Sequence, residues 1–262
     1  MAKIMETLRR HQFLFAELVK RDFKKKYKRT YLGMLWSLLS PLLTLLVMSV
    51  IFSNFFGTSI EHYTIYLFCG NIVWSYFSDA TNGGMGALMN NAAIFSKINV
   101  PKYLFLFSRN VSSLINFGLT FVVFLFFCLI NQVPITPLFL ALIIPIVLLV
   151  IFNIGMGLIL SAMFIFFRDV QYLWSVFLTL LMYMSAIFYD PYQFGDFEAV
   201  FHLNPVYVFI KYFRCIVLGL NGNAPAMPSV ELHLLLVFYA GVAFLAGSLI
   251  YKRMNHKFLY YI

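Results

Sequence analysis

The sequence is poor in charged residues. Asp, Glu, Lys and Arg together make up 11% of its 262 residues, whereas apolar residues make up 62%. A soluble domain carries about 25% charged and about 45–50% apolar residues. A chain of this composition has too few polar side chains to cover its surface in water. The scarcity of charge therefore excludes a soluble domain and predicts an integral membrane protein.

Sequence motifs for catalysis and metal binding are lacking as well. The sequence has no phosphate-binding loop ending in Gly-Lys-Ser/Thr and no Gly-x-Ser-x-Gly nucleophile elbow. Its histidines are isolated, and the three cysteines, Cys69, Cys128 and Cys215, lie in separate apolar stretches. Neither set has metal-ligand spacing or forms a disulfide framework. We therefore expect no catalytic residue, no metal site and no cofactor bound by this chain.

The basic residues that are present cluster at a few places. Ten of the 19 Lys and Arg lie in the first 30 residues, and three more, Lys252, Arg253 and Lys257, close the chain. No nucleic-acid recognition motif accompanies this charge. Basic residues that flank apolar stretches mark the cytoplasmic side of a membrane protein. The pattern therefore predicts a membrane as the partner rather than nucleic acid, and it places both termini in the cytoplasm.

Six apolar stretches approach the length of about 20 residues that a membrane-crossing helix requires. They are Tyr31–Phe56, Tyr63–Met89, Lys102–Leu129, Ile135–Phe166, Val170–Tyr189 and Leu232–Tyr251. The second is the least apolar, because it contains Asp79, Asn82 and a glycine-rich run. An even number of crossings returns the basic C-terminal tail to the side of the basic N-terminus. The predicted fold is an all-α integral membrane protein with six transmembrane helices.

Two further segments are predicted to be helical without crossing the membrane. Residues 1–30 are expected to form an amphipathic interface helix on the inner membrane surface; the alternative is a disordered basic tail. Residues 190–229 are expected to form a short re-entrant helical hairpin in the outer leaflet, because their apolar helix is too short to span. The chain then divides into this interface helix and a six-span domain, residues 31–262.

Charged residues inside apolar stretches are costly and therefore informative. Asp79 and Arg109 fall at comparable depth in the cytoplasmic half, which predicts a contact between them; alternatively, Arg109 extends alone to the inner headgroups. Tyr207, Lys211 and Arg214 share one face of the predicted outer helix. There they would guide an anionic or sugar-bearing substrate, or contact outer lipid phosphates.

The cytoplasmic link at residues 90–101 is unusually apolar, since it contains Ile94, Phe95 and Ile98. A short helix that inserts into the groove of a partner protein would bury these side chains. The alternative is that they pack against the N-terminal helix of the same chain.

Four motifs follow one another along the chain. They are Glu17–Lys24 with Leu32–Leu42, Phe95–Pro101, Phe167–Val170, and Leu203–Pro205 with Phe213-Arg214. In this order they resemble the membrane (permease) subunit of type-2 ABC exporters for cell-surface polysaccharides, over essentially the whole chain. One departure is that the family often has Ser-Pro at the end of the fifth span, where this chain has Ser185-Ala186. That helix end is therefore expected to be less kinked.

The resemblance implies a half-transporter. Two copies would form a homodimer around a pore, and two separate ABC ATPase subunits would bind ATP and Mg at the cytoplasmic side. The cargo would be a polysaccharide linked to polyprenyl pyrophosphate, of the O-antigen, teichoic acid or rhamnose-rich type. Export would cross a bacterial inner or plasma membrane. This chain would then be a transport subunit and not an enzyme.

Three sets of site residues are expected. The resemblance assigns coupling to the ATPase to Asn91, Ile94, Phe95, Lys97, Pro101, Arg168 and Asp169. A substrate path is predicted from aromatic residues that can stack on sugars and from the two cations of the outer helix. It comprises Trp36, Phe52, Tyr76, Tyr183, Phe188, Tyr189, Tyr207, Lys211 and Arg214. Basic residues near the inner mouth are expected to receive the lipid pyrophosphate, namely Lys24, Lys28, Arg29 and Arg109.

The sequence leaves three alternative functions open. An exporter of a drug, peptide or lipid would have the same fold. A membrane-embedded transferase would need clustered acidic residues for a metal ion, and the sequence lacks them. A purely structural membrane protein agrees with the composition, but it does not account for the apolar cytoplasmic link or the outer hairpin.

Overall fold

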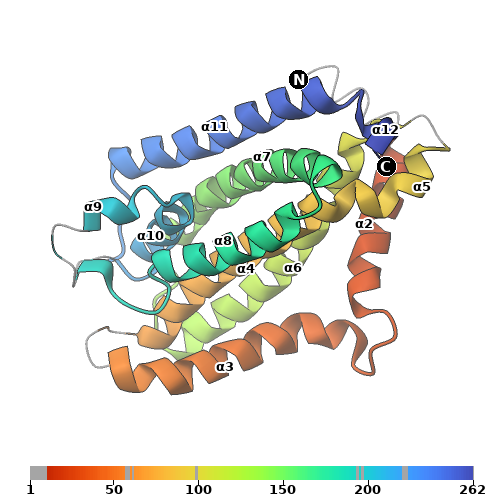
Figure 1. The fold of residues 1–262 in the computed structure, drawn as a ribbon. Helices are drawn as coiled ribbons and strands as arrows, with labels where there is room; N and C mark the ends of the chain where they lie inside the picture. Colours follow the sequence, from red (N-terminus) through yellow and green to blue (C-terminus); the bar gives the residue numbers. More distant parts are fainter. Residues whose placement is uncertain are drawn as a thin grey trace.

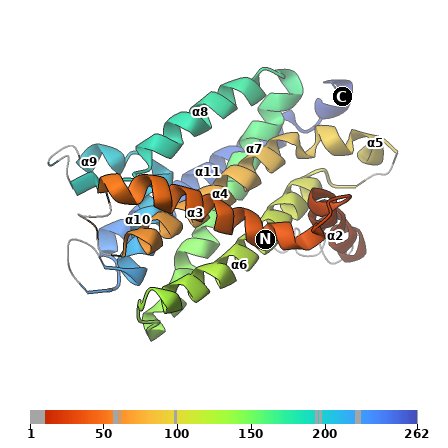
Figure 2. The same ribbon diagram turned by 90° about the horizontal axis from the view of Figure 1, so that it is seen from below.

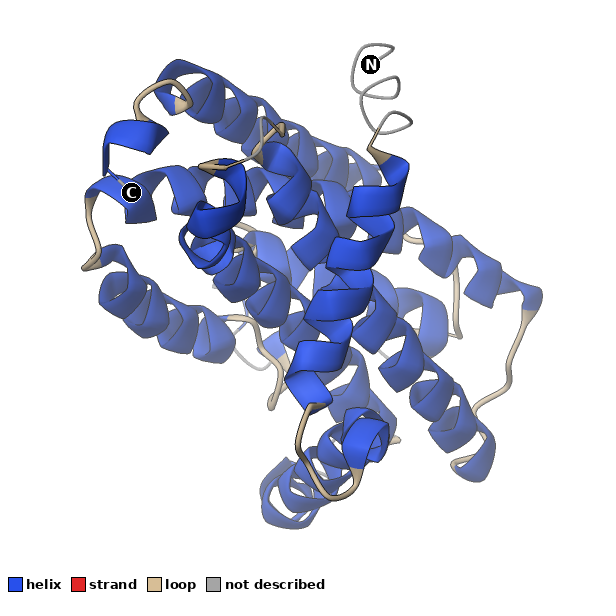
Figure 3. Ribbon diagram, turned by 90° about the vertical axis from the view of Figure 1, so that its right-hand side faces the viewer, coloured by secondary structure: helices blue, strands red, loops and turns tan. Residues whose placement is uncertain are grey.

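The computed structural model describes residues 11–56, 60, 62–97, 100–192, 195, 198–219 and 224–261. These residues form helices and loops only (Figure 3). The longer helices are α2 (Gln12–Tyr27), α3 (Trp36–Phe56), α4 (Tyr63–Ala87), α6 (Tyr103–Ile130), α7 (Ile143–Phe166), α8 (Val170–Met184), α10 (Pro205–Val217) and α11 (Val230–Met254). Short elements join them: η1 (Gly33–Leu35), η2 (Met89–Asn91), α5 (Ala92–Phe95), η3 (Pro137–Leu142), α9 (Glu198–Phe201) and α12 (Phe258–Tyr261).

The predicted membrane-crossing pattern is confirmed in part. Within the described part of the chain, four segments are long and apolar enough to cross a bilayer: Gly33–Phe52, Tyr103–Ile130, Pro137–Phe166 and Val230–Met254. Helix α4 has 25 residues, but its polar residues lower its hydropathy. Helix α8 has 15 residues, a rise of about 22 Å against a hydrocarbon core of about 30 Å. The chain is thus an all-helical membrane protein with four candidate spans.

The N-terminal segment is a helix where the structure describes it. Helix α2 carries three lysines in its last turn. Its Leu18 is buried in a cluster with Phe95 and Phe105, so α2 lies against the cytoplasmic link and α6. The first ten residues of the predicted interface helix lie outside the described residues, as does Ile98 of the link.

Helix α4 is the central helix of the bundle. Helices α3, α6, α7 and α10 pack around it (Figures 1 and 2), and 17 of its 25 residues are buried. Its aromatic side chains contact several neighbours at once: Phe77 packs against Phe152 of α7 and Trp174 of α8, and Phe68 packs edge-on against Phe124 of α6. Side chains on α4 are therefore positioned by the whole fold.

Small residues allow α7 and α11 to approach closely. A Cβ atom at Gly247 would overlap the carbonyl oxygen of Gly155, and a Cβ at Gly155 would overlap the backbone of Ala243. Close backbone approach at small residues is the usual basis of helix association in lipid, because apolar burial drives it only weakly there.

The end of the bundle that carries α2 also carries α5 and α12 (Figure 1). Lys102 links these parts. Its Nζ donates to the carbonyl oxygen of Asn255 at 3.0 Å and lies 5.8 Å from the ring centroid of Phe95 and 5.6 Å from that of Phe258. The C-terminal tail therefore packs beside the cytoplasmic link.

At the opposite end, helix α8 stops at Met184 and not at the predicted Tyr189. The chain turns at Ala186, whose φ of 47° is unusual for a residue with a Cβ. Polar side chains from the α10 segment hold this turn. Asn204 donates to Ser185 Oγ at 2.9 Å, and Arg214 donates to the carbonyl oxygens of Ala186 and Ile187 at 2.8 and 2.9 Å. These contacts stabilise a sharp turn directly after α8 although no proline is present there; that the helix end is less kinked than in the family stays a prediction.

Gly247→Ala is expected to lower the free energy of unfolding by about 1–3 kcal/mol, because the added methyl group forces α7 and α11 apart. Gly241→Ala is the matched control. Gly241 lies in the same helix with open space around its Cα, so alanine there is expected to be neutral or slightly stabilising. Thermal unfolding of the two purified variants in detergent tests this difference, and equal unfolding temperatures would contradict it.

Candidate functional site

Helix α4 exposes a polar face in an otherwise apolar bundle. This face lines a pocket of about 400 Å³ together with Met48 of α3 and Met182, Ile187 and Phe188 at the end of α8. The α4 residues in the pocket are Asn71, Trp74, Ser75, Ser78, Asp79 and Asn82. Amide, hydroxyl and carboxylate groups on a central helix are costly in lipid and are therefore typical of a transport path.

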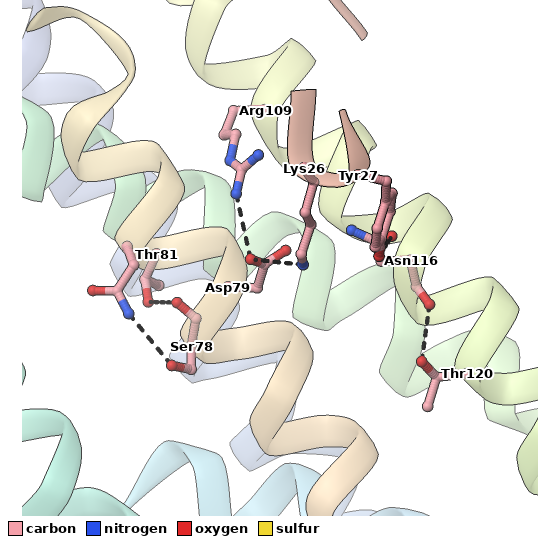
Figure 4. A network of polar contacts seen from close by, with 9 residues as sticks. Lys26, Tyr27, Ser78, Asp79, Thr81, Arg109, Asn116 and Thr120 are labelled. Carbon is pink, nitrogen blue, oxygen red and sulfur yellow. Dashed lines mark hydrogen bonds and ion pairs between the residues drawn. The ribbon is translucent and has the colours of Figure 1, made fainter. Parts of the chain in front are cut away.

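An ion-pair network centres on Asp79 (Figure 4). Asp79 Oδ1 lies 3.3 Å from Arg109 Nη2 of α6 and 3.2 Å from Lys26 Nζ of α2. The predicted contact between Asp79 and Arg109 is therefore confirmed, and Lys26 is a partner that the sequence did not reveal. Gly83 makes the geometry possible, because a Cβ there would overlap the Arg109 guanidinium.

Tyr27 attaches the end of α2 to α6. Its hydroxyl donates to Asn116 Oδ1 at 2.9 Å. Burial raises the pKa of Tyr27, and the nearby negative charge of Asp79 raises it further, so the hydroxyl stays protonated and remains a donor. Together with the Lys26 ion pair, this bond holds the C-terminal turn of α2 against α4 and α6.

Three pockets meet at Lys26. One is the pocket along the polar face of α4, and a second of about 380 Å³ lies between the end of α2 and helices α3, α4 and α6. The third, of about 530 Å³, reaches from α2 to Arg109 and the cytoplasmic link. Because Lys26 lines all three pockets, the ion-pair network lies where they meet.

The basic residues expected to bind pyrophosphate fall into two groups. Lys24, Lys28 and Arg29 are exposed and line one pocket of about 980 Å³ next to Gly33 and Met34. Arg29 and Gly33 both have positive φ angles, 64° and 54°, so the chain reverses sharply between α2 and α3. The structure thus brings three of the predicted cations together.

Arg109, the fourth cation of that set, lies elsewhere. It is paired with Asp79 and lines the pocket toward the cytoplasmic link. Its guanidinium is therefore partly neutralised, whereas the three others face solvent.

The residues expected to couple to an ATPase differ in their solvent exposure. Phe95 is 6% exposed because it packs against Leu18 and the ring of Phe105; the alternative that the link packs against the chain's own N-terminal helix holds for this residue. Asn91 is also buried, and its side chain donates to the Ala87 carbonyl at 2.7 Å.

The remaining coupling candidates are accessible. Lys97, Arg168 and Asp169 are exposed, and Ile94 and Pro101 are half-buried. Among the described residues of the link, Asn90, Ala93, Ser96 and Lys97 are exposed, while Phe95 packs against α2 and α6.

Four of the aromatic residues expected along a substrate path lie close together. Phe52 of α3 stacks on Phe188 at a centroid distance of 4.6 Å, and Tyr183 lies 6.2 Å from Phe188. Tyr189 donates its hydroxyl to the Tyr183 carbonyl at 2.7 Å. This group borders the polar pocket of α4, which Phe188 also lines.

Trp36 and Tyr76 line the neighbouring pocket between α2, α3, α4 and α6. The Tyr76 hydroxyl is used inside the protein, where it donates to Asn110 Oδ1 at 2.9 Å.

Lys211, Arg214 and Tyr207 were expected to share a surface that faces the substrate, but the structure places them differently. Arg214 is 2% exposed; besides the carbonyls of the turn after α8 it contacts the Tyr66 carbonyl, and its guanidinium lies 3.4 Å from the centroid of the Tyr66 ring. Tyr207 is buried as well. Lys211 Nζ lies 3.2 Å from His202 Nε2 and 5.4 Å from the ring centroid of Tyr192. In this chain Arg214 and Tyr207 therefore belong to the interior and form no surface for a substrate.

The comparison with known proteins decides the family. A family model described as ABC-2 type transporter matches residues 14–218. The chain belongs to the ABC-2 type transporter family. The match includes α2 through α10 and hence the whole polar face of α4.

Relatives of this ABC-2 protein cover nearly its full length. It is 26% identical over 263 residues to the O-antigen export system permease protein RfbA of Myxococcus xanthus, with 98% of each chain covered. A protein of the same name from Klebsiella pneumoniae is 26% identical over 249 residues, 94% of this chain and 93% of the relative. The capsule polysaccharide export inner-membrane protein CtrC of Neisseria meningitidis is 22% identical over 71% of each chain.

Asp79→Asn is expected to lower the free energy of unfolding by about 1.5–3 kcal/mol, because Arg109 and Lys26 both lose a charged acceptor while the side-chain volume is kept. Glu17→Gln is the matched control. Glu17 pairs with Lys20 at 3.7 Å on the exposed surface of α2, and such a pair contributes about 0–1 kcal/mol. Thermal unfolding in detergent compares the two variants. An equal loss of stability in both would contradict a special role for the Asp79 network.

Proposed function

We propose that this ABC-2 family member is the permease subunit that exports polysaccharide linked to polyprenyl pyrophosphate across the bacterial inner membrane. The observation that carries the proposal is the polar face of α4, from Asn71 to Asn82, inside an apolar bundle. A polyhydroxylated polymer exchanges its water shell for amide, hydroxyl and aromatic groups of this kind. The printed names of the relatives, O-antigen and capsule polysaccharide export proteins, support the same cargo. They do not favour a drug, peptide or lipid.

We further propose that two copies of the chain enclose the path. The polar pocket of α4 opens between α3 and α8. Both helices present apolar side chains away from the bundle, among them Val47 and Ile51 of α3 and Leu173 and Val176 of α8. A second copy placed against α3 and α8 would close the pocket into a channel. In this arrangement α4 crosses the membrane with the four apolar spans, and the short α8 crosses where the bilayer thins around it, which gives six crossings and cytoplasmic termini.

Energy is proposed to come from two separate ABC ATPase subunits, which bind ATP and Mg. ATP binding outside the membrane can open a channel only if it favours one of two packings of the helices. The cytoplasmic link offers the contact surface with Ala93, Ser96 and Lys97, and Arg168 and Asp169 are exposed at the turn between α7 and α8. Phe95 connects the link to α2 and α6. Movement of the link therefore reaches the helices around Asp79.

The decisive experiment reconstitutes the chain with its ATPase subunit in proteoliposomes. Lipid-linked polysaccharide is expected to stimulate ATP hydrolysis and to become accessible to a glycosidase on the opposite side of the membrane. A matched polyprenyl pyrophosphate without glycan and a hydrophobic drug serve as controls. Stimulation by the drug together with no response to the polysaccharide would overturn the proposed cargo.

Ala93→Asp is expected to abolish the stimulation of ATP hydrolysis by lipid-linked polysaccharide, because it places a charge on the exposed side of the link. Stability is expected to be unchanged, since the side chain points away from the bundle. Ala224→Asp is the control, an exposed alanine in the loop between α10 and α11, at the other end of the bundle (Figure 1). ATPase assays of the two reconstituted complexes test the assignment; full stimulation in the Ala93 variant would refute it.

A further inference from the structure

One pocket is not explained by a channel between two copies. It lies within a single chain, between the end of α2, the start of α3, and the facing sides of α4 and α6, and has a volume of about 380 Å³. Aromatic rings of Tyr27, Trp36, Tyr76 and Phe117 line it, interspersed with serine and threonine hydroxyls. Ligand pockets begin at about 300 Å³, so this one has room for a small ring.

Three buried polar atoms at this pocket lack a hydrogen-bond partner among the described residues. They are Ser113 Oγ, Asn116 Nδ2 and Asp79 Oδ2. Ser113 is 1% exposed, so its hydroxyl is almost fully enclosed. An unsatisfied buried polar group costs about 1–3 kcal/mol. The hydroxyl can donate and accept a hydrogen bond, the amide can donate one and the carboxylate can accept one. A ligand in the cavity would supply the partners that these groups lack.

The chemistry of the lining selects a neutral, hydroxylated ligand. Among the described residues that line it, Lys26 is the one cation and is already paired with Asp79, and an anionic ligand would face the Asp79 carboxylate. Aromatic faces beside hydroxyl, amide and carboxylate groups are suited to a sugar, because the C–H faces of a pyranose stack on rings while its hydroxyls donate and accept hydrogen bonds.

The pocket adjoins the basic pocket of Lys24, Lys28 and Arg29. Tyr27 lines both. A pyrophosphate held by the exposed cations would therefore direct the sugar attached to it toward the space behind Tyr27.

We propose that this intrachain pocket binds the sugar residue nearest the pyrophosphate of the lipid-linked substrate. The inference rests on the proposed function and adds to it a specific recognition site for the first sugar. Recognition uses two adjacent surfaces: the exposed cations hold the pyrophosphate, while Ser113, Asn116 and Asp79 bind the hydroxyls of the sugar. The permease thereby distinguishes a loaded carrier lipid from an empty one before export begins.

The test uses the complex with its ATPase subunit in nanodiscs and two probes, a polyprenyl pyrophosphate and the same lipid carrying one N-acetylhexosamine. The wild-type complex is expected to bind the sugar-bearing probe more tightly. Ser113→Ala is expected to weaken binding of that probe by about 2- to 10-fold, the effect of one lost hydrogen bond, without changing the affinity for the bare lipid.

Ser112→Ala is the matched control. Ser112 is the adjacent residue of α6, is equally buried and also has an unpartnered hydroxyl among the described residues, but it does not line the pocket. It is expected to bind both probes like the wild type. Thermal unfolding of both variants verifies that they fold alike.

Each other outcome overturns the inference in a recognisable way. Equal affinity of the wild type for the two probes means that the pocket holds water or lipid only. Equal losses in the Ser112 and Ser113 variants mean that helix packing, and not the pocket, is responsible. If polysaccharide export persists under either result, the proposed function stands without the sugar site. If the polysaccharide neither stimulates ATP hydrolysis nor is exported, the proposed function fails and the sugar site with it.

Discussion

The carboxylate of Asp79 connects three helices that are remote in sequence. In an apolar bundle a charge must find a counter-charge or hydrogen-bond partners inside the protein, because lipid cannot solvate it. Asp79 accepts from Arg109 of α6 and Lys26 of α2, and the docking of α2 depends on this arrangement. The polar face of α4 and the pockets that meet at Lys26 are positioned by the same contacts. The site therefore depends on one negative charge shared by two cations.

The opposite end of the bundle meets the same requirement without a carboxylate. Arg214 is surrounded by carbonyl oxygens of α4 and of the turn after α8, with the Tyr66 ring against its plane. A short helix that ends inside the protein leaves carbonyl groups without intrahelical partners. The guanidinium supplies donors for them, which accounts for the presence of a buried arginine on α10. The two cations thus differ in function: Arg109 borders an open pocket, whereas Arg214 completes a helix terminus.

Sequence reasoning located the helices well because apolar length is a local property. Helix α6 begins at Tyr103 against a predicted Lys102, and the pairing of Asp79 with Arg109 followed from counting residues along two helices. Lys26 was not identified as a partner, because its position depends on the reversal of the chain between α2 and α3. Helical spacing placed Arg214 on a face, but which neighbours cover that face is decided by tertiary packing. The orphaned Ser113 hydroxyl had no sequence signal, since an isolated serine in an apolar stretch is common.

Lys102 contacts both the link and residues that follow it far along the chain. The order of synthesis therefore affects when its contacts can form. Asn255 and Phe258 are partners of Lys102, yet Asn255 follows Lys102 by 153 residues along the chain and is therefore synthesised much later. Until they emerge, the ammonium group beside Phe95 lacks two of its contacts. The surface proposed to dock the ATPase subunit is therefore completed only after α11 has been synthesised, so a chain truncated before Asn255 would present an unfinished surface.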